Sequence, residues 1–128
     1  MTAGKSEIAI QTLFRSRARI LCPAVHIVAV PNAGKRSQWA AAQVKREGLA
    51  TGFPDIMCLF SHGGGENAIP VAAYIEFKSA KGRLSENQSE WIERLGRMGF
   101  PVTVARDADE AIEWLRGIGA PFIDREGL

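Results

Sequence analysis

Hydrophobic residues follow a helical spacing in some stretches of the chain and an extended spacing in others. From Glu7 to about Arg17, Ile10 and Phe14 share one helical face, and Ser6 precedes them as a potential N-cap. Helices are also predicted over residues 37–47, 86–98 and 107–116, the last two opened by capping-box patterns. Apolar and β-branched runs predict strands over residues 25–30, 55–60, 71–77 and 102–105. This order predicts an α/β fold, a small mixed central sheet of about four strands flanked by helices.

The run over residues 71–77 carries charge at its end, where a buried strand would remain apolar. Glu76 and Lys78 project to the same side of this strand, because side chains alternate between its two faces. Asp55 follows Pro54 at the start of another apolar run, and pairing of the two strands would bring Asp55 to Glu76 and Lys78. Charged groups are costly to bury without partners. Two carboxylates beside one lysine suit a divalent metal ion and an attacking water, so these residues are candidates for a catalytic site.

Three other polar positions each have two possible roles. Glu7 begins the inward stripe of the first helix, but the helix dipole also favours an acid there. Gln88 completes the capping box that Ser85 opens, and its position equally allows a role at the catalytic site. His26, in the first strand, either faces the metal site or is a hydrogen-bonded core histidine. Position in the sequence does not decide between these roles.

The length of the chain, 128 residues, is sufficient for a core without disulfides. We therefore expect residues 1–128 to form a single domain, with 119–128 as a tail that lacks clear periodicity. Cys22 and Cys58 lie in apolar surroundings and do not make a disulfide framework. No apolar run reaches the roughly 18–20 residues that cross a bilayer, and no signal-peptide core is visible. The expected location is the cytoplasm, without membrane contact.

The net charge of +2 is distributed unevenly along the chain. Residues 1–60 hold eight Lys and Arg against three acids, a balance of +5, and the remaining residues hold eight against eleven, a balance of −3. Basic residues such as Arg15, Arg17 and Arg19 could present a positive surface to a polyanion. They could equally form a solvated helix surface, and the charge count does not separate the two.

A phosphate-binding P-loop follows a strand, as do the turn over residues 31–34 and the basic pair Lys35-Arg36. That motif needs glycine in place of Ala29 and serine or threonine in place of Arg36. A nucleotide cofactor is therefore not expected.

Five short motifs occur in a fixed order on the predicted elements. They are Glu7 in the first helix, Pro31-Asn32-Ala33-Gly34 with a following base, Gly52-Phe53-Pro54-Asp55, Glu76-Phe77-Lys78, and Gly82-Arg83-Leu84-Ser85 leading to Gln88 and Trp91. Together they resemble the PD-(D/E)xK nuclease superfamily, and more closely its VRR-NUC family, the virus-type replication-repair nucleases. The resemblance spans Glu7 to about Leu115 and implies a restriction-endonuclease-like core. One departure is Ala33, where many relatives have glycine.

The resemblance implies a role for each matched residue. Mg²⁺ or Mn²⁺ would be held by Glu7, Asp55, Glu76 and the backbone carbonyl of Phe77. Lys78 would position or deprotonate the attacking water, and Gln88 would orient Lys78 or contact DNA. Phosphates of the nucleic acid would be contacted by the polar and basic residues around the site, which are Asn32, Lys35, Arg36, Lys81 and Arg83.

The expected function is a metal-dependent DNA endonuclease. By resemblance to small stand-alone members of the family, we expect a homodimer that selects branched DNA such as four-way junctions. Two alternatives belong to other classes of protein. One is a nucleic-acid-binding module on the same fold that does not cut, and the other is a structural α/β domain whose acids form a buried salt-bridge network.

Overall fold

The structure, a computed structural model, describes residues 5–31, 48 and 50–123. The helix predicted over residues 37–47 lies outside these residues. The helices and strands in chain order are α1 (Glu7–Leu21), β1 (His26–Ala29), β2 (Ile56–His62), a 3₁₀ turn (Gly65–Asn67), β3 (Ile69–Phe77), α3 (Glu86–Arg97), β4 (Val102–Ala105) and α4 (Ala108–Gly117). No helix in the described part of the chain is long and apolar enough to span a membrane.

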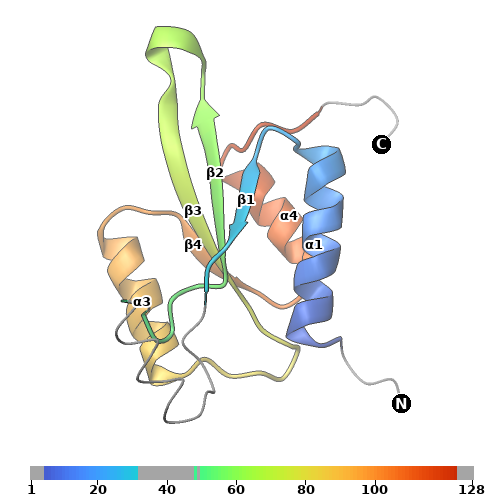
Figure 1. Cartoon of the computed structure of the whole chain (residues 1–128), viewed down its shortest axis with the longest axis vertical. Helices are drawn as coiled ribbons and strands as arrows, with labels where there is room; N and C mark the ends of the chain where they lie inside the picture. The colour runs from blue at the N-terminus through green and yellow to red at the C-terminus, as the bar shows by residue number, and fades with distance from the viewer. Residues whose placement is uncertain (1–4, 32–47, 49, 124–128) are drawn as a thin grey trace.

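The four strands form one mixed sheet in the order β1-β2-β3-β4. The pairs β1/β2 and β2/β3 are antiparallel, whereas β4 runs parallel to β3. Figure 1 shows α1 and α4 side by side against one face of the sheet and α3 on the other side. The predicted α/β fold with a mixed four-stranded sheet is therefore confirmed.

The main core lies between the sheet and the pair α1/α4. Alternate residues of β2 and β3 face these helices, because side chains on a strand alternate between its faces. The strand residues of this core are Ile56, Cys58, Phe60, Ala73, Ile75 and Phe77. The opposite face carries a smaller aromatic cluster of Phe53, Tyr74, Trp91 and Phe100, which packs α3 onto the sheet. Odd-numbered residues near the end of β3 therefore face α1 and α4, and even-numbered residues face α3.

Helix α1 is longer than predicted. Its N-cap is Ser6, whose hydroxyl accepts a hydrogen bond from the Ala9 backbone N–H, but the helix ends at Leu21 and not near Arg17. The buried stripe of Ile10 and Phe14 continues to Ala18, one more turn along the same face, and this burial extends the helix.

Two side chains lie in places that the sequence pattern did not predict. His26 is exposed on the edge strand β1, so it faces neither the site nor the core. Met98 continues the spacing of Trp91 and Leu95 along α3, which predicts a place on the core face, but it is 61% exposed. It is the C-cap residue of α3, beyond the last turn that packs on the sheet.

Candidate active site

Asp55 and Glu76 occupy facing positions at one end of the β2/β3 pair. The register pairs Ile56 with Ile75, so the next position along the two strands sets Asp55 opposite Glu76. Facing residues of antiparallel strands have Cβ atoms about 4.5–5.5 Å apart, which brings their carboxyl groups together. Asp55 Oδ2 also accepts a hydrogen bond of 3.0 Å from the Phe77 backbone N–H. The convergence expected of Asp55 and Glu76 is what the structure shows.

Glu76 is buried, with 1% of its surface exposed. The pKa of its carboxyl group is raised to about 9, mainly by burial and also by the neighbouring Asp55 carboxyl, although Lys78 acts in the opposite direction. Its Oε1 is buried and has no hydrogen-bond donor in the part of the chain that the structure describes. Glu76 therefore keeps its carboxyl group in a desolvated place beside a second carboxyl group, that of Asp55.

Gln88 makes the capping contact that the sequence allowed, and its side chain also reaches Glu76. Its side-chain oxygen accepts from the Ser85 backbone N–H at 2.8 Å, and the Ser85 hydroxyl accepts from the Gln88 backbone N–H, which completes the capping box of α3. The amide nitrogen at the other end of the same side chain donates to Glu76 Oε2 at 3.4 Å. The N-terminus of α3 is thereby tied to the candidate site.

Lys78 follows the last residue of β3, and its backbone N–H donates to the Ala105 carbonyl. Its ammonium nitrogen lies 4.0 Å from Glu7 Oε1, and only 12% of its side chain is exposed. Glu7 is the first residue of α1, and its side chain is about half exposed. The structure thus brings Glu7 to Lys78, while Asp55 and Glu76 form the other half of the site.

The geometry of the strand directs the Phe77 carbonyl toward the side of β3 on which Asp55 lies. The N–H and C=O of one residue in an antiparallel ladder point toward the same neighbouring strand, and the Phe77 N–H points to Asp55. Continuing the β2/β3 register sets Pro54 opposite Phe77. Proline has no N–H to donate, so the Pro-Asp pair interrupts the ladder beside this carbonyl.

The remaining predicted contacts divide into two groups. Lys81 and Arg83 are exposed in the loop between β3 and α3, directly after Lys78. Asn32, Lys35 and Arg36 lie outside the described residues. The segment that contains these three starts beside the site, because the Val30 N–H donates to the Asp55 carbonyl at 2.8 Å.

Arg106 shapes the loop after Lys78, and the sequence motifs did not indicate it. Its Nη1 donates to the carbonyl oxygens of Ser79 (2.8 Å) and Gly82 (2.7 Å). Arg106 directly follows β4, whose parallel pairing with β3 sets it beside this loop. That pairing was not readable from the sequence, and no motif surrounds the arginine.

Gly52 also supports the candidate site, although the sequence indicates it only as the first residue of the Gly52-Phe53-Pro54-Asp55 motif. Its φ of +83° lies in the left-handed region, and a Cβ atom there would come 2.6 Å from the Asn87 backbone carbon. The segment that delivers Asp55 is therefore packed directly on the first turn of α3, which carries Gln88. Only glycine permits this approach.

The donor set fits a divalent cation such as Mg²⁺. Two carboxyl groups face each other, and one of them has a buried oxygen that no donor of the described residues reaches, so a cation between them would be stabilising. No group of three or more His, Cys, Asp or Glu side chains gathers as a metal site within residues 5–31, 48 and 50–123. Mg²⁺ does not require one, since it commonly binds through one or two carboxylates and keeps several waters.

Comparisons with known proteins agree with this architecture. The VRR-NUC domain matches residues 5–109 of the chain. A solved structure described as a VRR_NUC domain protein superposes with a TM-score of 0.67 at 23% sequence identity, covering 89% of this chain and 88% of that one. No curated protein matches.

The matched region contains every element of the candidate site, from Glu7 in α1 to Arg106 after β4. At 23% identity the structural similarity establishes the fold, and the domain match establishes the family. The chain belongs to the VRR-NUC domain family, a family of nucleases.

Proposed function

We propose that this protein is a metal-dependent endonuclease that hydrolyses phosphodiester bonds of DNA at the site between Asp55, Glu76 and Lys78. The observation that carries the proposal is Glu76, a buried carboxylate that faces Asp55 and has one oxygen without a donor among the described residues. Such a group is costly to a fold and is explained by a cation that it holds.

The metal ligands we propose are Asp55, Glu76 and the Phe77 carbonyl, and the ion is Mg²⁺ or Mn²⁺. Glu7, expected from the sequence as a further ligand, does not gather with these two carboxylates in the described residues and lies instead against Lys78. When bound, the ion offsets the charge of the phosphate and lowers the pKa of water at the site. Phe77 supports the arrangement twice, since its N–H fixes the Asp55 carboxylate and its carbonyl is directed to the same side.

Lys78 brings a largely desolvated ammonium group to the site, and Glu7 holds it from the side of α1. There it would orient the attacking water or offset negative charge that develops on the phosphate. Gln88 fixes the Glu76 carboxylate from α3. The end of β3 thus provides Glu76 and Lys78, and contacts from α3 and α1 hold these two side chains.

The DNA backbone would be positioned by the cations around the site. Lys81 and Arg83 are exposed on the adjoining loop, and Asn32, Lys35 and Arg36 belong to the proposed set by sequence. Contacts to phosphates position DNA without reading its bases. We therefore propose recognition of DNA shape, with branched DNA such as four-way junctions as substrate. Cutting two strands in this way would use two copies of the chain, one site for each strand.

A structural salt-bridge network is the competing explanation for the same acids. A network of that kind is stable only when its remaining lone pairs are satisfied. Glu76 Oε1 has no donor in the described part of the chain. This observation favours a site that a ligand completes.

Cleavage by purified variants tests the proposal. Asp55→Asn and Lys78→Met should each reduce cleavage by about 10²-fold or more, because each removes a group that acts on the reacting phosphate or water. Cleavage of labelled four-way and linear DNA is measured with Mg²⁺, Mn²⁺ or EDTA, with faster cutting expected for the four-way DNA.

The matched control is Asp109→Asn, an exposed carboxylate that pairs with Arg17 away from the site. It should cut like the unaltered protein, and circular dichroism should show that all three variants are folded. Undiminished cleavage by either site variant would refute the assignment.

A further inference from the structure

We infer that Arg15 and Arg19 form a second phosphate-binding point, which holds the DNA backbone at a distance from the cleavage site. The inference rests on the proposed function, because it assumes a nucleic-acid substrate. It concerns a cavity that is separate from Asp55, Glu76 and Lys78.

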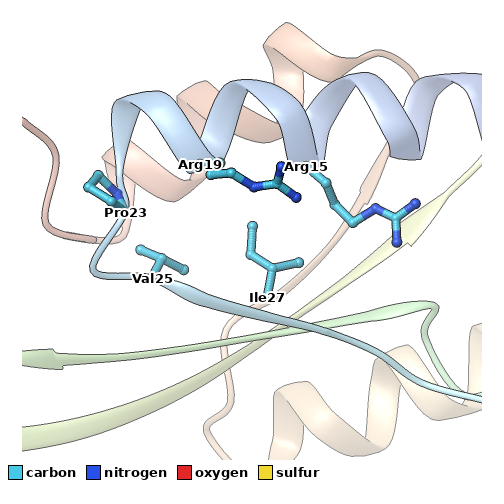
Figure 2. A pocket seen from close by; sticks show the side chains of 5 residues that line it. All are labelled: Arg15, Arg19, Pro23, Val25 and Ile27. Atoms are coloured by element: carbon cyan, nitrogen blue, oxygen red, sulfur yellow. The ribbon is translucent and has the colours of Figure 1, made fainter.

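The cavity lies between α1 and the edge strand β1. It has a volume of about 190 Å³ and is lined by Arg15, Arg19, Pro23, Val25 and Ile27. Figure 2 shows the two arginine side chains on the side of α1 that faces β1, with Val25 and Ile27 on the opposite wall. Both side chains extend along the cavity toward the N-terminal half of α1. Apolar walls suit arginine, whose methylene stem packs on them while its guanidinium remains free.

Most other arginines of the described residues have a partner. Arg17, on a different face of α1, pairs with Asp109. Acidic side chains also pair with Arg94, Arg97 and Arg116, and backbone carbonyls hold Arg106. Within the described residues, Arg15 and Arg19 have no hydrogen-bond or ion-pair partner, and they share this with Arg83 beside the catalytic site.

Two unpaired guanidinium groups one helical turn apart repel each other. Like charges at positions i and i+4 destabilise a helix. An anion between them removes this cost, and guanidinium groups bind phosphate oxygens in a bidentate manner. The arrangement therefore has the chemistry of a phosphate site.

The position of the cavity indicates DNA as the source of that phosphate. Helix α1 starts at the catalytic site with Glu7 and leads directly to Arg15 and Arg19. With a rise of 1.5 Å per residue, the two arginines lie about 12 Å and 18 Å further along the helix axis. DNA rises 3.4 Å per base pair, so these distances correspond to about four to five base pairs from the bond that is cut.

The test is the salt dependence of DNA binding, measured in the uncleaving Asp55→Asn background on a long duplex. Each phosphate contact that is lost lowers the slope of log K against log salt by about 0.9. Removing both guanidinium groups in Arg15→Gln/Arg19→Gln should therefore lower the slope by about 2. The control Arg17→Gln/Arg97→Gln removes the same charge from two paired arginines, and it should leave the slope nearly unchanged.

A second comparison separates a local contact from a general loss of charge. On duplexes that extend less than about four base pairs beyond the site, the Arg15/Arg19 variant and its control should bind equally. Loss of affinity that does not depend on duplex length, or equal slopes for variant and control, would overturn the inference. Both outcomes leave the proposed nuclease activity intact. Failure of the Asp55→Asn protein and of the unaltered protein to bind DNA at any salt concentration would instead contradict the proposed function itself.

Discussion

At the scale of single residues, Glu76 is where the requirements of folding and of the site conflict. It lies at the end of a hydrophobic strand, and its burial raises the pKa of its carboxyl group to about 9. Without a cation, the folded protein retains a proton on this group at neutral pH, whereas the unfolded chain releases it near the ordinary pKa of about 4.3. The metal-free fold is therefore weakened as the pH rises.

The metal-free protein should lose stability between about pH 5 and pH 9, the interval between the two pKa values. In this window the folded state binds one more proton than the unfolded state, so the free energy of unfolding falls with pH, by up to about 1.4 kcal/mol per pH unit. Glu76→Gln removes the titrating group. The free energy of unfolding of both proteins is measured by urea denaturation in EDTA at each pH. The stability of Glu76→Gln relative to the unaltered protein should increase steadily from pH 5 to pH 9.

The difference between the two proteins isolates Glu76, because every other titrating group is common to both. Below about pH 4 the difference should be constant, since the carboxyl group is then protonated in both states. A difference that remains constant from pH 5 to pH 9 would show that Glu76 ionises normally in the folded protein.

At the scale of elements, the site depends on the contact between the segment before β2 and the first turn of α3. Gly52 makes this contact and adopts a φ of +83°. Gly48 has nearly the same backbone angle, +78°, but no heavy atom of residues 5–31 or 50–123 lies within 4 Å of the position of its Cβ. The two glycines therefore separate the cost of the backbone angle from the cost of the contact.

Gly48→Ala should cost about 1–2 kcal/mol of stability, the penalty of a side chain in the left-handed region. Gly52→Ala carries the same penalty and adds a Cβ atom 2.6 Å from the Asn87 backbone, so we expect a clearly larger loss of stability. It should also reduce cleavage, because the segment that carries Asp55 must move. Thermal unfolding and cleavage of both variants are compared, and equal losses in the two would contradict this account of the contact.

Most elements could be predicted from the sequence because each has a local signal. Ser6, Ser85 and Asp107 all act as N-caps, as their positions at the start of apolar periodicity indicated. The end of α1 was misplaced because Ala18, a small residue, extends the buried stripe without a strong hydrophobic signal. The parallel pairing of β3 and β4 could not be derived from any local pattern.

The site could be predicted in part for the same reason. Charged residues stand at the ends of two apolar runs, namely Asp55, Glu76 and Lys78. Because charged groups are costly to bury, these positions indicate a functional site. Arg106 is an exposed arginine in a polar segment, and its hydrogen bonds to the loop after Lys78 depend on the strand order. Arg15 and Arg19 could not be told from Arg17 by charge alone, since only the packing of α1 shows which of them is paired.

At the scale of the whole molecule, the site joins segments that are distant along the chain. Glu7 opens α1, Asp55 precedes β2, Glu76 lies in β3, Lys78 follows β3, and Gln88 lies in the first turn of α3. A cation bound among these segments stabilises only the folded chain, since unfolding separates its ligands. Metal binding and folding should therefore be coupled through Glu76.

Thermal unfolding in Mg²⁺ or Mn²⁺, with EDTA as the reference, tests this coupling most directly. At a concentration 100 times the dissociation constant, a bound ion adds about 2.7 kcal/mol of stability, which raises the Tm by several degrees. We expect this rise for the unaltered protein and for Asp109→Asn, and no rise for Glu76→Gln. A Tm that does not respond to either metal, or an equal rise in Glu76→Gln, would contradict the claim that the carboxylates hold a divalent ion.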